Sequence, residues 1–176
     1  MLNNKKITLR ALTSEDLPKI NLWRNDHELN KLTLGIRFPK SLELDKSWLD
    51  RALNDISNKN IYFGIVELEN SDFIGIIQLS NIDWISRVGD FGISIGDKKN
   101  TNKGYGKESM ILFFNYVFFD LNIRKINLKV VSYNTNAISV YKSSGFLQEG
   151  LLKNEVFYDN QYHDVIVMAL FVENFK

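Results

Sequence analysis

The sequence predicts a single α/β domain with a strand–helix–strand unit in its second half. The chain has 176 residues, a length that usually forms one domain with a substantial core. Apolar residues recur with the period of strands in some segments and of helices in others. No repeat, low-complexity tract or linker rich in Pro, Gly or Ser divides the chain. We therefore place one domain over residues 1–176.

The first half predicts a strand, two capped helices and a hairpin. Thr13 is an N-cap residue with Asp16 three positions on, and Ser41 is a second N-cap. The segments expected in order are a strand over 7–12, a helix from Thr13 to about Asn25, irregular chain over 26–39, a helix from Ser41 through Leu53, and strands over 61–67 and 73–79 around "ENSD".

The second half alternates strands and helices. Gly145 ends the last helix as the residue after its C-cap. The segments expected are a strand over 88–95, a glycine loop, a helix over about 107–120, a strand over 125–131, a short helix over 134–144, and closing strands over 146–151 and 165–171. The resulting order, β-α-α-β-β-β-α-β-α-β-β, is typical of a mixed α/β fold.

Composition excludes several classes of function. A formal net charge of +1 gives no global electrostatic basis for binding nucleic acid or membranes. The absence of cysteine removes disulfides, thiolate nucleophiles and cysteine zinc sites. His27 and His163 lie far apart, so we predict no metal. The polar N-terminus and the lack of an 18-residue apolar run predict a cytoplasmic protein without a membrane span.

The stretch "NTNKGYGKESM", Asn100 to Met110, predicts a loop that leaves a strand and opens a helix. A nucleotide-triphosphate loop fails here, because Glu108 stands where Ser or Thr is needed and Thr101 where the first Gly is needed. A dinucleotide loop is weak, because Ser109 replaces its third Gly. The loop is otherwise either an anion cradle, with free N–H groups of the helix start beside two lysines, or a flexible connection without a ligand.

The stretch "NTNAISVYKSSGF" supplies the second motif, N-x-x-A-x-x-x-Y-x-x-x-G-F over 134–146. Together with the T-x-x-G-x-G loop at 101–106, it resembles the GCN5-related N-acetyltransferase (GNAT) superfamily. The opening "ITLRALTSEDLPKINLWRND" and the tail from Gly145 resemble its RimJ/RimL-like branch, and the tail also resembles polyamine acetyltransferases. "LWRND" and "FPKS" resemble its amino-sugar acetyltransferases.

The resemblance implies a GNAT-like single domain, with a mixed, mostly antiparallel central sheet flanked by helices, that uses acetyl-CoA and releases coenzyme A. In that family, backbone N–H groups of the loop hold the pyrophosphate, and the preceding strand pairs with the pantetheine arm. Thr101 stands where the family has Gln or Arg, so binding of the pyrophosphate should depend on the backbone N–H groups of the loop. Asn134 is equally suited to cap the next helix. The implied cofactor contacts are Phe91, Ile93, Ser94, Ile95, Thr101, Asn102, Lys103, Gly104, Tyr105, Gly106, Lys107, Asn134 and Lys142.

Tyr141 and Asp90 are the catalytic candidates. The resemblance implies direct attack of an amine on the thioester, with Tyr141 protonating the departing thiolate. A tyrosine pKa of about 10 is close enough to a thiol pKa of about 8.5 for this role; the alternative is a packed aromatic. Asp90 stands where many relatives carry a glutamate base. Because aspartate is shorter, a water relay is expected; the alternative is an exposed strand carboxylate. A backbone N–H of residues 91–95 would stabilise the oxyanion.

The acceptor cleft of this branch lies between the first two helices and the C-terminal strands. The residues expected to line it are Trp23, Arg24, Asn25, Trp84 and Tyr158, with Phe38, Trp48 and Tyr162. The sequence leaves four kinds of acceptor amine possible: a polyamine, an amino sugar, an antibiotic and a protein N-terminus. It also leaves open whether the protein forms a homodimer.

Two alternative functions come from different classes. A non-catalytic module that binds coenzyme A or senses a ligand would share the fold. An RNA-binding protein would use Lys98, Lys99, Lys103 and Lys107, but the near-zero net charge argues against it.

Overall fold

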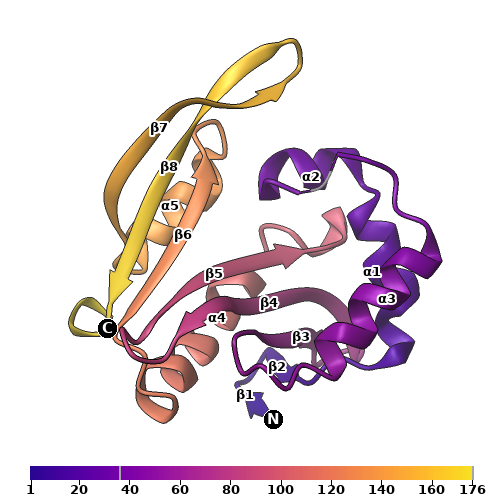
Figure 1. Cartoon of the computed structure of the whole chain (residues 1–176). Helices are drawn as coiled ribbons and strands as arrows, with labels where there is room; N and C mark the ends of the chain where they lie inside the picture. Colours follow the sequence, from indigo (N-terminus) through magenta and orange to yellow (C-terminus); the bar gives the residue numbers. More distant parts are fainter. Residues whose placement is uncertain (36, 176) are drawn as a thin grey trace.

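The computed structural model describes residues 1–35 and 37–175. Its sheet has the strand order β1-β2-β3-β4-β5-β6-β8-β7 (Figure 1). The strands are β1 (Leu2–Asn3), β2 (Ile7–Arg10), β3 (Ile61–Glu67), β4 (Asp72–Asp83), β5 (Val88–Ile95), β6 (Lys125–Val131), β7 (Leu147–Tyr158) and β8 (Gln161–Phe171). The helices are α1 (Leu17–Arg24), α2 (His27–Thr33), α3 (Leu42–Leu53), α4 (Tyr105–Asn115) and α5 (Thr135–Ser143). All neighbouring strands are antiparallel except β5 and β6, which confirms the predicted mixed, mostly antiparallel sheet.

The parallel contact between β5 and β6 is short, and this shortness creates the site. The two strands pair only at Val88–Lys125, Gly89–Ile126 and Asp90–Asn127. Beyond Asp90 they separate, while β4 stays paired with β5 as far as Ile95 (Figure 1). One backbone edge of residues 91–95 is therefore left without a strand partner in the described part of the chain. Unpaired strand edges are natural places for an extended ligand to add main-chain hydrogen bonds.

Two apolar clusters hold the helices against opposite faces of the sheet. Phe91, Phe113, Phe114 and Phe146 form the centre of the larger cluster, with the Phe91 and Phe114 ring centroids 4.9 Å apart. This cluster fixes α4 and α5 on one face. The smaller cluster of Leu12, Ile20, Trp23, Leu49 and Phe73 seats α1 and α3. No helix among the described residues combines the length and apolarity needed to cross a bilayer.

The predicted caps are present. The Thr13 N–H donates to Asp16 Oδ2 at 2.8 Å, closing the capping box that begins a 3-10 turn before α1. The Leu44 N–H donates to Ser41 Oγ at 3.2 Å at the start of α3. Each cap satisfies helix N–H groups that have no partner within the helix.

The expectation of irregular chain over 26–39 was wrong, because this segment contains α2. The side chain of Asp26 caps the helix by accepting from the Leu29 N–H at 3.0 Å. No residue of α2 is fully buried. A helix without a buried face shows no apolar periodicity, which is the signal on which sequence reasoning depends.

The C-terminal hairpin is longer than its predicted strands. β7 reaches Tyr158 and β8 starts at Gln161, so the pair projects from the body (Figure 1). Asp159 and Asn160 form its turn with φ of 49° and 60°, the pair of positive values that a two-residue type I′ turn needs. Most residues in the outer half are exposed, so apolar alternation there is weak.

Smaller differences concern element ends. β1 was not expected, β4 continues to Asp83, and α4 begins at Tyr105 rather than Lys107. The last predicted turn of that helix, Tyr116–Asp120, is a π-helix.

Candidate active site

The glycine loop ends in a helix start whose N–H groups are free. Gly104 precedes α4 with a φ of 85°, a value that glycine adopts without strain. Within residues 1–35 and 37–175, the backbone N–H groups of residues 102–107 have no hydrogen-bond acceptor. A Cβ added at Gly104 or Gly106 would meet no atom within 4 Å. Free N–H groups, the positive end of a helix and open space together suit an anion.

A groove of about 370 Å³ runs from this loop along β5 to α5. The unpaired edge of β5 forms one wall, and Leu128, Lys129 and Val130 of β6 form the facing wall. The predicted cofactor residues that line it are Phe91, Ile93, Ser94, Ile95, Thr101, Asn102, Gly104, Tyr105, Gly106, Lys107 and Asn134. The lining does not include Lys103 or Lys142, which are exposed.

The side chains of Thr101 and Asn134 are already occupied by local hydrogen bonds. Thr101 Oγ1 donates to the Lys98 carbonyl at 2.8 Å. The loop would therefore contact a ligand through its backbone N–H groups rather than through this side chain. Asn134 caps α5 by accepting from the Ala137 N–H at 3.2 Å. Its Nδ2 donates to the Leu32 carbonyl at 3.1 Å, so this asparagine also ties α5 to α2.

Tyr141 is placed by the end of α5. The Gly145 N–H donates to the Lys142 carbonyl and the Phe146 N–H to the Tyr141 carbonyl, both at 3.1 Å. With φ of 93° at Gly145, this is a Schellman motif. The rings of Tyr141 and Phe146 lie 5.6 Å apart, as the motif's apolar contact. The motif therefore explains the spacing Y-x-x-x-G-F and aims the tyrosine at the groove.

The hydroxyl of Tyr141 has no hydrogen-bond partner within the described residues, although the side chain lines the groove. Burial raises the pKa of Tyr141 to about 12, because the charged phenolate is disfavoured away from water. The side chain is therefore a neutral O–H donor at physiological pH.

The groove also contains residues that sequence reasoning missed. Asn100 is 6% exposed, and its Nδ2 has no acceptor among the residues that the structure describes. A buried donor without a partner is costly, and a ligand carbonyl or phosphate would satisfy it. Leu29, Leu32 and Thr33 bring α2 to the groove. Asn100 adjoins the recognised loop, which was the available signal, whereas nothing in the sequence marked α2.

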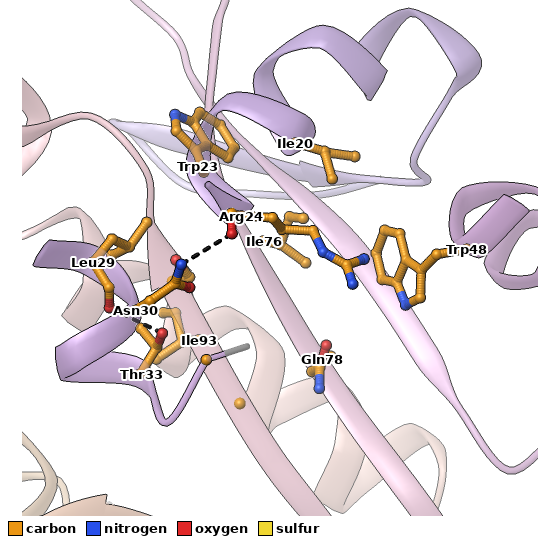
Figure 2. Close-up of a pocket in the computed structure, with 13 residues that line it drawn as sticks. Ile20, Trp23, Arg24, Leu29, Asn30, Thr33, Trp48, Ile76, Gln78 and Ile93 are labelled. Carbon is orange, nitrogen blue, oxygen red and sulfur yellow. Dashed lines mark hydrogen bonds between the residues drawn. The ribbon is translucent and has the colours of Figure 1, made fainter. Parts of the chain in front are cut away.

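A second cavity of about 320 Å³ lies on the face of the sheet covered by α1, α2 and α3 (Figure 2). Trp23, Arg24 and Trp48, three of the residues expected at the acceptor cleft, line it, whereas no described residue of the C-terminal strands does. It shares residues with the cofactor groove. The shared residues are Leu29 and Thr33 of α2, and Gly92, Ile93 and Ser94 of β5.

The other residues expected at the acceptor cleft lie outside this cavity. Asn25 Oδ1 accepts from the Lys40 N–H at 2.8 Å and so holds the chain that leads to α3. Trp84 Nε1 donates to the Asn58 carbonyl at 2.7 Å. Tyr158 is buried beneath Arg37, whose guanidinium carbon lies 4.2 Å from the ring centre. Phe38 and Tyr162 are exposed and line neither cavity.

Asp90 also lines neither cavity. It is exposed and accepts from Asn81 Nδ2 at 3.0 Å. Alternation along β5 places its side chain on the same face as Gly92 and Ser94. It belongs to the last residue pair before β5 and β6 separate.

These features define a class of protein. A sheet opened between two parallel strands, with a glycine loop at a helix start and a tyrosine at the opening, is the arrangement of an acetyl-CoA-dependent N-acetyltransferase. The chain belongs to the acetyltransferase (GNAT) domain family, which it matches over residues 6–147. The superfamily predicted from the two motifs is thereby confirmed.

Similar proteins include two curated N-acetyltransferases. YokL, an uncharacterised N-acetyltransferase from the SPbeta prophage of Bacillus subtilis, is 27% identical over 98% of this chain and 93% of its own. The spermidine N(1)-acetyltransferase of Vibrio cholerae is 29% identical over 92% and 91%. A crystal structure of spermidine N-acetyltransferase from Vibrio cholerae with CoA and spermine superposes with a TM-score of 0.89, at 27% identity over 97% and 98% of the two chains. None of these names singles out the RimJ/RimL-like branch, which stays a prediction.

Proposed function

We propose that the chain transfers the acetyl group of acetyl-CoA to the primary amine of a small molecule held in the cavity beneath α1, α2 and α3. The observation that carries this proposal is the sharing of β5 by both cavities. Gly92, Ile93 and Ser94 face the cofactor groove and the second cavity alike. A thioester lying along the edge of β5 would therefore present its carbonyl to an amine arriving from the other cavity.

Positioning supplies much of the catalysis in this proposal. The free N–H groups of residues 102–107 would bind the pyrophosphate, and the open edge of β5 would bind the pantetheine amides. Two reactants held in contact react as one molecule, which removes much of the entropic barrier. An N–H of β5 would stabilise the oxyanion that forms on the thioester carbonyl.

The proposed chemical step is direct transfer. The amine nitrogen forms a bond to the carbonyl carbon, the carbon–sulfur bond breaks, and Tyr141 donates its proton toward the departing thiolate. The Tyr141 pKa of about 12 is well above the ordinary thiol pKa of about 8.5, which makes proton transfer to the thiolate less favourable. Burial of the bound thioester would also raise the pKa of the coenzyme thiol, because burial disfavours the thiolate as well as the phenolate, and this would narrow the difference between the two pKa values.

The amine must lose a proton before it attacks. An alkylammonium with a pKa of about 10.4 is mostly charged at neutral pH. Asp90 lies on the acceptor face at the point where the strands separate, outside the cavity itself. We assign it the role of a base acting through water, in keeping with its short side chain.

The names of the relatives support a small-molecule amine. Three similar proteins are named spermidine N(1)-acetyltransferase, and one similar structure holds CoA and spermine. The test is a turnover assay for free coenzyme A thiol across polyamines, amino sugars with and without phosphate, aminoglycosides and peptide N-termini. We expect turnover with at least one small amine. Tight binding of coenzyme A without acetylation of any amine would instead indicate a sensing module.

A further inference from the structure

Arg24 is the one charged side chain among the described residues that line the acceptor cavity. The remaining lining is aromatic, aliphatic or neutral and polar. Its guanidinium lies beside Trp48 and above Gln78 (Figure 2). A site for a polycation would need carboxylates to balance each ammonium, and the described lining contains none.

The partner of Arg24 lies behind it rather than in the cavity. Arg24 Nε is 3.2 Å from Asp45 Oδ1, and Asp45 is 0% exposed. Asn21 Nδ2 donates to the other carboxylate oxygen at 2.8 Å. Within the described residues, the two terminal nitrogens of Arg24 have no acceptor. The contact with Asp45 is an ion pair without a hydrogen bond, since Asp45 Oδ1 has no hydrogen-bond partner among the described residues. The forked end of the guanidinium is therefore available, and such a fork binds carboxylate and phosphate groups.

The ring of Trp48 in this cavity does not favour a cationic acceptor either. The guanidinium carbon of Arg24 lies 4.7 Å from the ring centre of Trp48. An aromatic face attracts cations, but this one already has a cation over it. A second ammonium placed beside it would meet a like charge, which is unfavourable.

Two carboxylates on segments that flank the cavity are occupied by other groups. Asp97 accepts from Trp23 Nε1 at 2.9 Å, and Asp26 caps α2. The chain between α2 and α3 adds Arg37 and Lys40 without an acidic residue. These two carboxylates are therefore engaged, while Asp50 and Asp55 line a separate cavity that Trp48 also borders.

From this charge distribution we propose that the acceptor is a primary amine that also carries an anionic group, a carboxylate or a phosphate, bound by Arg24. This assignment rests on the acetyltransferase function proposed above and names its substrate class. It separates this chain from relatives named for spermidine. The neutral donors and acceptors of Asn30, Gln78 and Ser94 would bind the remainder of the molecule.

The test compares amines that differ only in the charge at the far end. The first series is 1-aminobutane, 4-aminobutanoate and 1,4-diaminobutane, with 3-aminopropyl phosphate as the phosphate counterpart. The second is glucosamine against glucosamine 6-phosphate, with spermidine as the polyamine. We expect kcat/KM for the better anionic amine to exceed that for the matched neutral amine by at least about tenfold, and the diamine to rank last.

Variants of Arg24 test whether this residue causes the preference for anionic amines. Arg24→Gln alone would leave Asp45 buried without a counterion, so it is combined with Asp45→Asn. In this double variant kcat/KM for the anionic amine should fall to the level of the matched neutral amine. Arg24→Lys keeps the charge and the ion pair but not the fork, so it should retain part of the preference. Arg51→Gln on α3, an exposed arginine outside this cavity, is the matched control and should behave as the wild type.

The possible results distinguish an error in the substrate class, in the role of Arg24 and in the acetyltransferase function. A wild-type preference for spermidine or 1,4-diaminobutane over every anionic amine would overturn the substrate class while leaving the acetyltransferase function intact. An unchanged preference in the folded double variant would overturn the role of Arg24. Absence of any acetylated amine would contradict the proposed function itself.

Discussion

Tyr141 shows how a single residue acquires a role from local structure. Its position on α5 is fixed by the Schellman motif at Gly145, and its ring is held by Phe146 and Phe91. The hydroxyl alone remains uncommitted within the described residues. A side chain whose ring is packed and whose polar atom faces a groove is suited to donate to a ligand.

Replacing Tyr141 by Phe should remove the proton donor and keep the packing. Because general acid catalysis typically contributes about 10²–10⁴-fold, we expect kcat to fall by about 100-fold. Coenzyme A affinity, measured by calorimetry, should change by less than about twofold, since the cradle is backbone. A variant with undiminished kcat would exclude Tyr141 as the acid.

The pH dependence follows from the raised pKa of Tyr141. Its folded-state pKa of about 12 exceeds the ordinary value of about 10, so the donor form persists as pH rises through 10. We expect kcat at saturating substrate to show no loss from tyrosine ionisation up to about pH 10. A falling limb below that pH, present in the wild type and absent in Tyr141→Phe, would contradict this.

At this scale more of the predicted cofactor residues than of the predicted acceptor residues line the cavity expected for them. The loop and the Asn134–Phe146 motif have fixed spacings because backbone geometry demands them. The contact between Arg24 and Trp48 depends on how α1 and α3 pack, which no local pattern encodes. For the same reason Trp84 and Tyr158, expected at the cleft, have partners elsewhere.

At the scale of elements, the two glycines at the start of α4 can be tested separately by substitution. Gly104 needs its positive φ, whereas Gly106 lies in the first turn of the helix without one. Glycine at the second position is therefore not required by the fold. Its lack of a Cβ is explained if a ligand approaches the backbone there.

Gly106→Ala separates folding from binding. A Cβ there meets no atom within 4 Å, and alanine favours a helix by up to about 1 kcal/mol, so urea unfolding should show equal or greater stability. The added methyl would occupy the space of the pyrophosphate, and coenzyme A affinity should fall at least about tenfold. Gly150→Ala, where the Cβ would make an ordinary contact 3.8 Å from Val167, is the control. Unchanged affinity in Gly106→Ala would rule out the cradle.

Element boundaries could be predicted where one face of a strand or helix is buried. β3, β5 and β6 match their expected ranges, because each contributes side chains to the core. α2 and the outer part of the β7–β8 hairpin could not be predicted, since exposed elements show little apolar periodicity. α2 is nevertheless the helix that lines both cavities.

At the scale of the whole molecule, stability rests on the aromatic cluster behind β5. Phe114 is 0% exposed and contacts the rings of Phe91, Phe118 and Phe146. The cluster joins α4, α5 and β5, so it holds together the three elements that form the cofactor groove. Damage to it should affect folding and binding together.

Phe114→Ala should lower the free energy of unfolding by about 3–5 kcal/mol, the usual cost of removing a buried phenylalanine. Phe119→Ala, on the following turn and 64% exposed, should cost less than about 1 kcal/mol. Denaturant unfolding of both variants provides the comparison. Equal losses in the two would show that the cluster is not the main source of stability.

The two cavities that share β5 are formed mostly by different parts of the sequence. The acceptor cavity is formed mainly by residues 20–48, with Ile76 and Gln78, whereas most of the cofactor groove is formed by residues 91–141. Substitutions in α1 and α3, which line the acceptor cavity but not the cofactor groove, should therefore change which amine is accepted without altering the thioester site. With such a division, the acceptor preference of this chain can be re-engineered separately from its thioester site.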